Sequence, residues 1–131
     1  MQLQVAFTAD NSIYKQMVEA LFSTKLTEAD GSFIYNKERK IQEGIIFKDP
    51  RRTLKESIAP PQTIVFLIDL AKDIAIGTAS GIIANILYDK LKNCLWLKIG
   101  NQSPKLTLED IRKVVQEELE KLRNKDDSEK T

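Results

Sequence analysis

The sequence predicts an α+β fold in a single domain, and three observations support this class. The chain has 131 residues, 42% hydrophobic and 30% charged, which is enough for one sizeable core and too short for two. Residues 2–7 alternate between polar and apolar side chains, as half-buried strands do. The apolar residues between 108 and 122 instead recur at helical spacing. We therefore expect both strands and helices.

The first half of the chain alternates between helix and strand signals. Cap residues followed by an apolar stripe predict a helix from about Ser12 to Lys25. Two β-prone runs, Ser32–Tyr35 and Ile41–Phe47, flank a charged stretch. They predict a hairpin that turns at residues 36–40, with Gly44 at a bulge.

A connector and one long helix are expected next. Residues 48–62 have prolines at both ends, which favours a connector. Pro61 suits the first turn of a helix, where its missing N–H costs nothing. The run Thr63–Leu91 is apolar and predicts a long Gly/Ala-rich helix, and Cys94–Ile99 then predicts a strand.

The last element has the clearest signals. Thr107 is an N-cap candidate, with Asp110 three residues later as in a capping box. An apolar stripe from Leu108 to Leu122 forms one side of the helix that follows. Residues 125–131 are charged and carry no apolar side chain, so we expect a disordered tail after a domain of residues 1–124.

The order of the expected elements points to a particular architecture. Strand, helix, two strands, long helix and strand is the order of the ferredoxin-like, split βαβ fold, in which two helices cover one face of an antiparallel sheet. The C-terminal helix is an addition to that arrangement.

The long apolar run raises the question of a membrane. As a helix, Thr63–Leu91 is long enough to cross a bilayer, but three charged residues between 69 and 73 interrupt it. The uncharged remainder, Ile74–Tyr88, is shorter than the ~20 residues that a span needs, so a membrane span is disfavoured. The N-terminus lacks a signal-peptide pattern and the lone Cys94 suits a reducing compartment, so we expect a cytoplasmic location.

Residue types that carry catalysis are scarce. The chain has no histidine and one cysteine, which excludes histidine triads, typical zinc sites and disulfide frameworks. Asp69 and Asp73 are spaced to share a helical face and suit acid–base chemistry or a divalent cation, or else the wet stripe of a buried helix. A clustered third acid and a glycine-rich phosphate loop are both missing from the sequence. We expect no enzyme activity, no cofactor and no metal.

A small-residue pattern in the long helix suggests a contact surface. Interior glycines cost a helix about 1 kcal/mol each, so close approach by another element is expected at Gly77 and Gly81. That element is the rest of the domain, a second copy of the chain or another protein, and leucine at both positions is expected to destabilise. The candidate partner-contact residues are Gly77, Gly81, Ala84, Leu108, Ile111, Val115 and Leu119.

The connector carries a local excess of positive charge. Its candidate anion contacts are Lys48, Arg51, Arg52 and Lys55. The nearby Tyr35 and Phe47 are candidates for stacking on nucleic-acid bases. The net charge of the chain is +1, however, which argues against a domain built mainly for nucleic acid.

A proline pair, an apolar helix with a basic end and a strand follow one another in the second half. The residues are Ala59-Pro60-Pro61, Gly77-x-x-x-Gly81, Leu87-Tyr88-Asp89-Lys90-Leu91-Lys92 and Cys94–Ile99, about a third of the chain. In this order they resemble the effector-associated constant-component domains of bacterial conflict systems. The resemblance implies a non-catalytic module working beside an effector protein, although the helix-rich C-terminus departs from such domains.

The sequence therefore predicts a non-catalytic protein–protein interaction or oligomerisation module that binds a protein partner or itself. The alternative is a small nucleic-acid- or phosphate-binding module that uses the basic residues between 48 and 55.

Overall fold

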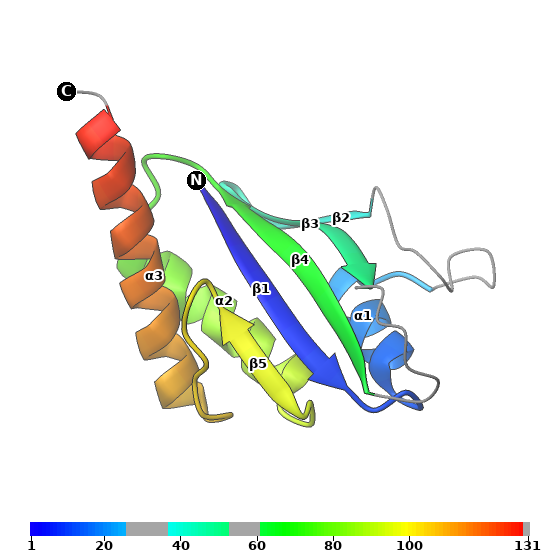
Figure 1. Cartoon of the computed structure of the whole chain (residues 1–131). Helices are drawn as coiled ribbons and strands as arrows, with labels where there is room; N and C mark the ends of the chain where they lie inside the picture. The colour runs from blue at the N-terminus through cyan, green and yellow to red at the C-terminus, as the bar shows by residue number, and fades with distance from the viewer. Residues whose placement is uncertain (26–36, 53–60, 130–131) are drawn as a thin grey trace.

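In the computed structural model, the described residues are 1–25, 37–52 and 61–129, and they form a five-stranded antiparallel sheet and three helices (Figure 1). The strands are Gln2–Ala9 (β1), Glu38–Gln42 (β2), Ile45–Arg52 (β3), Gln62–Leu70 (β4) and Trp96–Ile99 (β5). The helices are Tyr14–Phe22 (α1), Ile76–Leu91 (α2) and Leu108–Glu129 (α3). The predicted α+β class is confirmed.

The sheet is covered on one face. Its strand order is β2-β3-β4-β1-β5, and α1 and α2 lie behind it in Figure 1. Alternate side chains of β1 and β4, such as Val5 and Phe66, are fully buried beneath these helices. The edge-to-face contact of Phe22 with Phe66, with ring centroids 5.7 Å apart, joins α1 to the centre of the sheet.

The β2–β3 hairpin turns at a different place from the one predicted. The charged stretch 36–40 was expected to be the turn, but Glu38–Gln42 is a strand and the chain turns at residues 43–44. Gly44 has φ +87°, a conformation that suits a tight turn, and the bulge lies at Ile41 instead. Because β2 is an edge strand, its charged side chains can remain in water while its backbone pairs with β3. The expected strand at 32–35 lies outside the described residues.

The predicted long helix is wrong over nearly the first half of its length. Gln62–Leu70 is a central strand between β1 and β3, so Pro61 precedes a strand and not a helix, and the helix itself begins at Ile76. A continuous apolar run suits either a buried helix or a buried strand, and periodicity does not separate the two. The expected connector is likewise strand β3 as far as Arg52.

Helix α3 begins as predicted. The backbone N–H of Asp110 donates to Thr107 Oγ1 at 3.2 Å, which is the expected cap. The helix runs to Glu129 and so includes residues that were expected to form a disordered tail. It packs beside α2, and the guanidinium of Arg123 donates to the carbonyls of Lys72 and Ile74 in the turn between β4 and α2.

Candidate functional site

Most of the predicted partner-contact residues lie inside the chain. Ala84 on α2, and Ile111, Val115 and Leu119 on α3, are all fully buried. The apolar stripe of α3 therefore packs within the domain and is not available to a partner. Leu108, at the start of α3, is different because 40% of it is exposed.

The glycine pair faces open space. A Cβ atom built at Gly77 or at Gly81 would meet no heavy atom within 4 Å. The rest of the domain therefore does not make the expected close approach at the glycines, and the small residues that α2 buries are Ala79, Ser80 and Ala84. The buried Ser80 hydroxyl has no hydrogen-bond partner among the described residues, including the backbone groups of its own helix.

The basic residues of the former connector are divided between two faces of β3. Lys48 lies opposite Leu67 and Arg51 opposite Val65, so one residue of β4 faces the two residues Asp49 and Pro50. This bulge, where Asp49 has φ +53°, returns Arg51 to the same face as Lys48. Arg52 lies on the helix side, where its guanidinium donates to the Tyr14 hydroxyl at 3.2 Å. Lys55 lies outside the described residues.

One of the two predicted stacking aromatics is buried. Phe47 is fully buried in the core and packs on Phe66, with ring centroids 5.5 Å apart, so its prediction as a base-stacking residue is wrong. Tyr35 lies outside the described residues.

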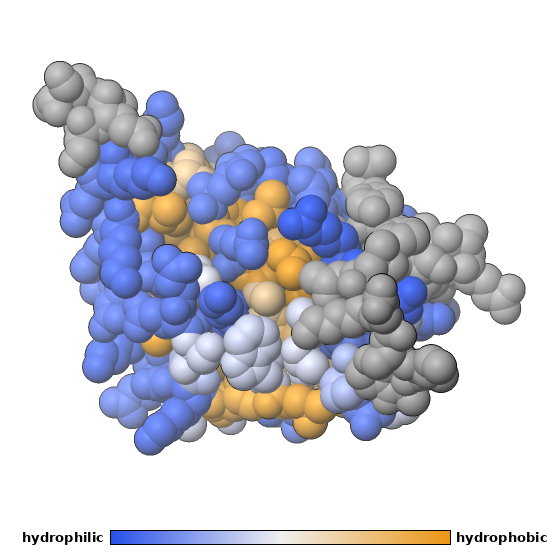
Figure 2. Space-filling view, viewed as in Figure 1, coloured by the Kyte–Doolittle hydropathy of each residue, from blue (hydrophilic) through white to orange (hydrophobic). Residues whose placement is uncertain are grey.

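The uncovered side of the sheet, which we call the open face, gathers the remaining candidates. Its central pairs are Gln4 with Leu67, Ala6 with Val65 and Thr8 with Thr63, on β1 and β4. Lys48 and Arg51 lie on one flank and Trp96 and Lys98 on the other. In Figure 2, hydrophobic atoms gather over the middle of this face, with hydrophilic side chains around them. The open face thus has an aliphatic centre and basic flanks.

The charges of the open face are unequal. Lys40, Lys48, Arg51 and Lys98 face this side, against the acids Glu38 and Asp69. Lys40 Nζ is also paired with Glu43 Oε2 at 2.7 Å. Lys48 Nζ lies 3.8 Å from Asp69 Oδ2, a long and partly exposed ion pair that leaves most of the positive field in place. Asp69 is on a strand and Asp73 is in the turn after it, so the predicted helical pair of carboxylates does not exist.

Trp96 and Lys98 were missed by sequence reasoning. Trp96 lies in the predicted strand but was not a candidate site residue, and 42% of it is exposed on the open face, at the pair with Thr8. The available signal was the alternation in 96–99, in which Leu97 and Ile99 are the buried members. The alternation does not say which strand of the sheet lies next to these residues.

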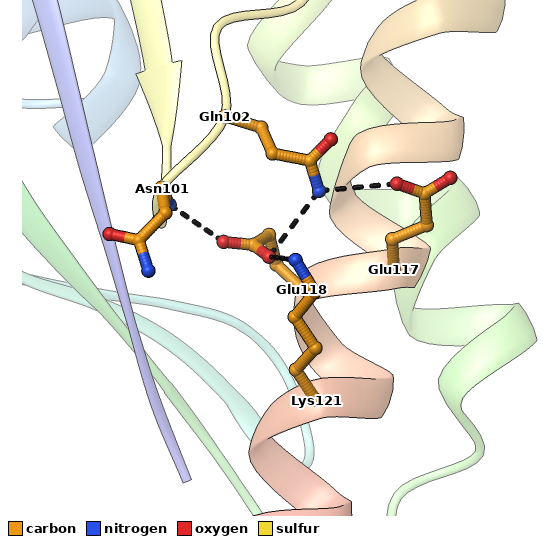
Figure 3. Close-up of polar contacts among 5 residues, drawn as sticks. All are labelled: Asn101, Gln102, Glu117, Glu118 and Lys121. Atoms are coloured by element: carbon orange, nitrogen blue, oxygen red, sulfur yellow. Dashed lines mark hydrogen bonds and ion pairs between the residues drawn. The ribbon is translucent and has the colours of Figure 1, made fainter.

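A second polar cluster joins α3 to the turn after β5 (Figure 3). Glu118 is 4% exposed, and its carboxylate accepts from the Asn101 backbone N–H at 2.6 Å and from Gln102 at 3.4 Å, with Lys121 Nζ at 3.0 Å. Burial is the largest single effect on the pKa of Glu118 and would raise it, but these hydrogen bonds and the Lys121 charge together lower it. The ionised form of Glu118 is therefore the form that holds the turn.

The backbone at Gly100 completes this cluster. Gly100 has φ +58°, and a Cβ there would overlap the Glu118 carboxylate, so both conformation and space require glycine. The groove beside the cluster has a volume of about 390 Å³, but its acid is fully engaged in hydrogen bonds. We interpret the cluster as a structural clasp between α3 and the sheet.

Other reactive groups offer little chemistry. Burial raises the pKa of the Cys94 thiol to about 11, which keeps it protonated and unreactive at neutral pH. Within residues 1–25, 37–52 and 61–129, histidine, cysteine and acidic side chains do not gather in threes as a metal site would need. None of the helices in the same ranges combines the length and apolarity needed to cross a bilayer.

No family model, curated protein or solved structure matches the chain.

The clasp predicts a pH-dependent contribution to stability. Glu118→Gln should lower the free energy of unfolding at neutral pH by about 1–2 kcal/mol, because a charge-assisted set of hydrogen bonds is weakened. The folded state lowers the pKa of Glu118 from its ordinary value of 4.5. The contribution to stability is therefore complete above pH 4.5 and is lost as the pH falls through the lowered pKa. Urea unfolding across that pH range measures whether the free energies of unfolding of the wild type and Glu118→Gln converge in acid.

Glu117→Gln is the matched control for the clasp. Glu117 is the adjacent acid and has one contact here, from Gln102 at 3.1 Å. A loss at Glu117 as large as that at Glu118, or a Glu118 effect that does not shrink in acid, would contradict the clasp.

The exposed glycines predict stabilisation by alanine. Gly81→Ala should raise the free energy of unfolding by about 1 kcal/mol, because alanine is the better helix former and the new methyl group meets open space. Gly81→Leu should also fold, whereas Ala84→Leu should lose about 1–3 kcal/mol by overpacking the buried side of α2. Thermal unfolding and analytical ultracentrifugation measure both effects. A wild-type dimer that Gly81→Leu dissociates would show instead that the glycines form an interface.

Proposed function

We propose that the protein is a non-catalytic binding module whose open face receives a protein partner. The observation that carries the proposal is the aliphatic centre of that face, on the two central strands of the sheet. Leu67 there is half-buried and Trp96 is 42% exposed. Helices α1 and α2 lie on the other side of the sheet, and α3 stands beside its β5 edge (Figure 1). Contiguous apolar surface with a polar rim is typical of interaction sites.

The arrangement of the strands supports a ferredoxin-like fold with one added strand. If β2 is set aside, the elements follow the order strand, helix, two strands, helix, strand. The remaining sheet order, β3-β4-β1-β5, is antiparallel throughout, as a split βαβ sheet requires. We infer that β2 is an edge addition and that α3 is a second addition beside α2.

The resemblance to effector-associated constant-component domains implies the same class of function. The partner surface differs from the one that the sequence suggested, because the apolar side of α3 is used within the chain. A module that works beside another protein needs a surface for it, and the open face supplies one.

A phosphate-bearing ligand is the second candidate. The observation that favours it is the bulge that places Lys48 and Arg51 on one face, across the sheet from Lys98. In single-stranded nucleic-acid binding, several aromatic side chains stack on successive bases. Among the described residues of the open face, Trp96 on β5 is the single aromatic side chain that could do so. The central strands β1 and β4 present aliphatic and uncharged polar side chains in place of further aromatics, so a protein partner suits the face better.

Site-specific photo-crosslinking tests the proposal. A photo-reactive amino acid at Gln4, on the open face, should give a discrete protein adduct in extracts of the native cell. The same group at Gln116, exposed on the outer side of α3, should not. Adding Leu67→Lys should reduce the Gln4 adduct, because it places a charge in the aliphatic centre.

The adduct itself separates the alternatives. Equal protein adducts from Gln4 and Gln116, or none from Gln4, would contradict a partner on the open face. A nuclease-sensitive adduct from Gln4 would establish the phosphate-bearing ligand instead. Circular dichroism of each variant confirms that the fold is intact.

A further inference from the structure

We propose that the partner segment on the open face is an acidic amphipathic helix that lies along β1 and β4. This inference rests on the proposed function and adds the shape and charge of the partner. It follows from three properties of the open face: the spacing of its basic flanks, the length of its central strands and the sign of its charge.

The distance between the two basic flanks matches the width of one α-helix. Arg51, Val65, Ala6 and Lys98 form a row across four neighbouring strands. Three strand spacings of about 4.8 Å place the Arg51 and Lys98 backbones roughly 14 Å apart. An α-helix with its side chains is about 10–12 Å wide, so it fits between them.

The floor between the flanks is low and aliphatic. Ala6 and Val65 are short side chains at the centre of the row, and each is 8% exposed. Leu67 lies next along β4 and Trp96 lies at the end of the face near Thr8. Toward the ends of the floor the residues are polar, with Gln2 and Gln4 at one end and Thr8 and Thr63 at the other. The middle of an apolar helix face on this floor therefore meets aliphatic side chains, and its two sides meet the basic flanks.

The length of the floor sets the length of the helix. β1 has 8 residues, or about 26 Å at ~3.3 Å per residue. A helix that rises ~1.5 Å per residue covers this distance with about 17 residues.

The charges select an acidic helix. Arg51 and Lys98 stand on opposite flanks, and Lys48 adds to the Arg51 side. Asp69 partly neutralises Lys48, and Glu38 faces Lys48 across the β2–β3 pair, so the free positive charge is greatest at the Arg51–Lys98 row. Acidic side chains on both sides of the bound helix would complement this row, whereas basic ones would be repelled.

The chain carries its own reporter for the test. Trp96 is its single tryptophan and lies on the open face, so a covering helix should shift its fluorescence to shorter wavelength. The probe is a synthetic helical peptide of about 17 residues without tryptophan, with leucines on one side and glutamates on both flanks. The full chain should bind this peptide saturably, and more weakly as salt is added. The same peptide with lysine in place of glutamate should bind at least about tenfold more weakly.

Two adjacent arginines supply the matched variants. Arg51→Ala should weaken binding of the acidic peptide roughly threefold to fivefold, the loss of about one exposed ion pair. Arg52→Ala should leave the affinity unchanged, because Arg52 lies on the helix side against Tyr14. Equal effects of the two variants, or equal affinities of the acidic and basic peptides, would overturn the proposal.

Two further measurements examine other occupants. Saturation of the Trp96 signal by a single-stranded oligonucleotide at lower concentration than by the acidic peptide would overturn the proposal in favour of nucleic acid. A dimer in analytical ultracentrifugation that forms together with the Trp96 shift would overturn it in favour of a second copy. A protein adduct from Gln4 without peptide binding would overturn the acidic helix alone, whereas the absence of both would overturn the binding function itself.

Discussion

The pairing of β1 with β4 is the constraint on which the rest of the structure depends. Its register runs without a shift from Gln2 with Asp69 to Ala9 with Gln62. It places Val5 beside Phe66 in the core and Ala6 beside Val65 on the open face. Because strand side chains alternate, a slip of one residue would exchange these two faces. The same register therefore determines the core beneath α1 and α2 and the aliphatic centre of the open face.

The β3 bulge gives the open face its basic flank. In an unbroken strand, Lys48 and Arg51 would point to opposite sides, because three positions separate them. The left-handed backbone at Asp49 inserts one extra residue, and Arg51 returns to the open face while Arg52 reaches Tyr14. Asp49 is a residue type that tolerates this conformation, and its N–H donates to the Lys37 carbonyl at 3.0 Å. The bulge thus divides two adjacent arginines between a surface role and a structural one.

Helix α3 is tied to the domain by buried and polar contacts together. Its apolar side packs within the core, Glu118 holds the turn at Gly100 and Asn101, and Arg123 holds the turn before α2. These contacts use the surface that the sequence suggested for a partner. The uncovered side of the sheet is consequently the surface with both aliphatic and basic groups facing outward.

The sequence by itself determined the α+β class, the strand β1, the approximate place of α1 and the start of α3 at Thr107, because alternation, helical periodicity and capping are local patterns. Only the tertiary structure decided that Gln62–Leu70 is a strand. A continuous apolar run can form either a buried helix or a buried strand, and pairing with neighbouring strands selects the strand. The candidate site was predictable in part: Lys48 and Arg51 were identified from charge, but Trp96 and Lys98 join them through pairing between distant strands. Side-chain partners across a sheet depend on register and bulges, which belong to pairs of strands and not to one segment.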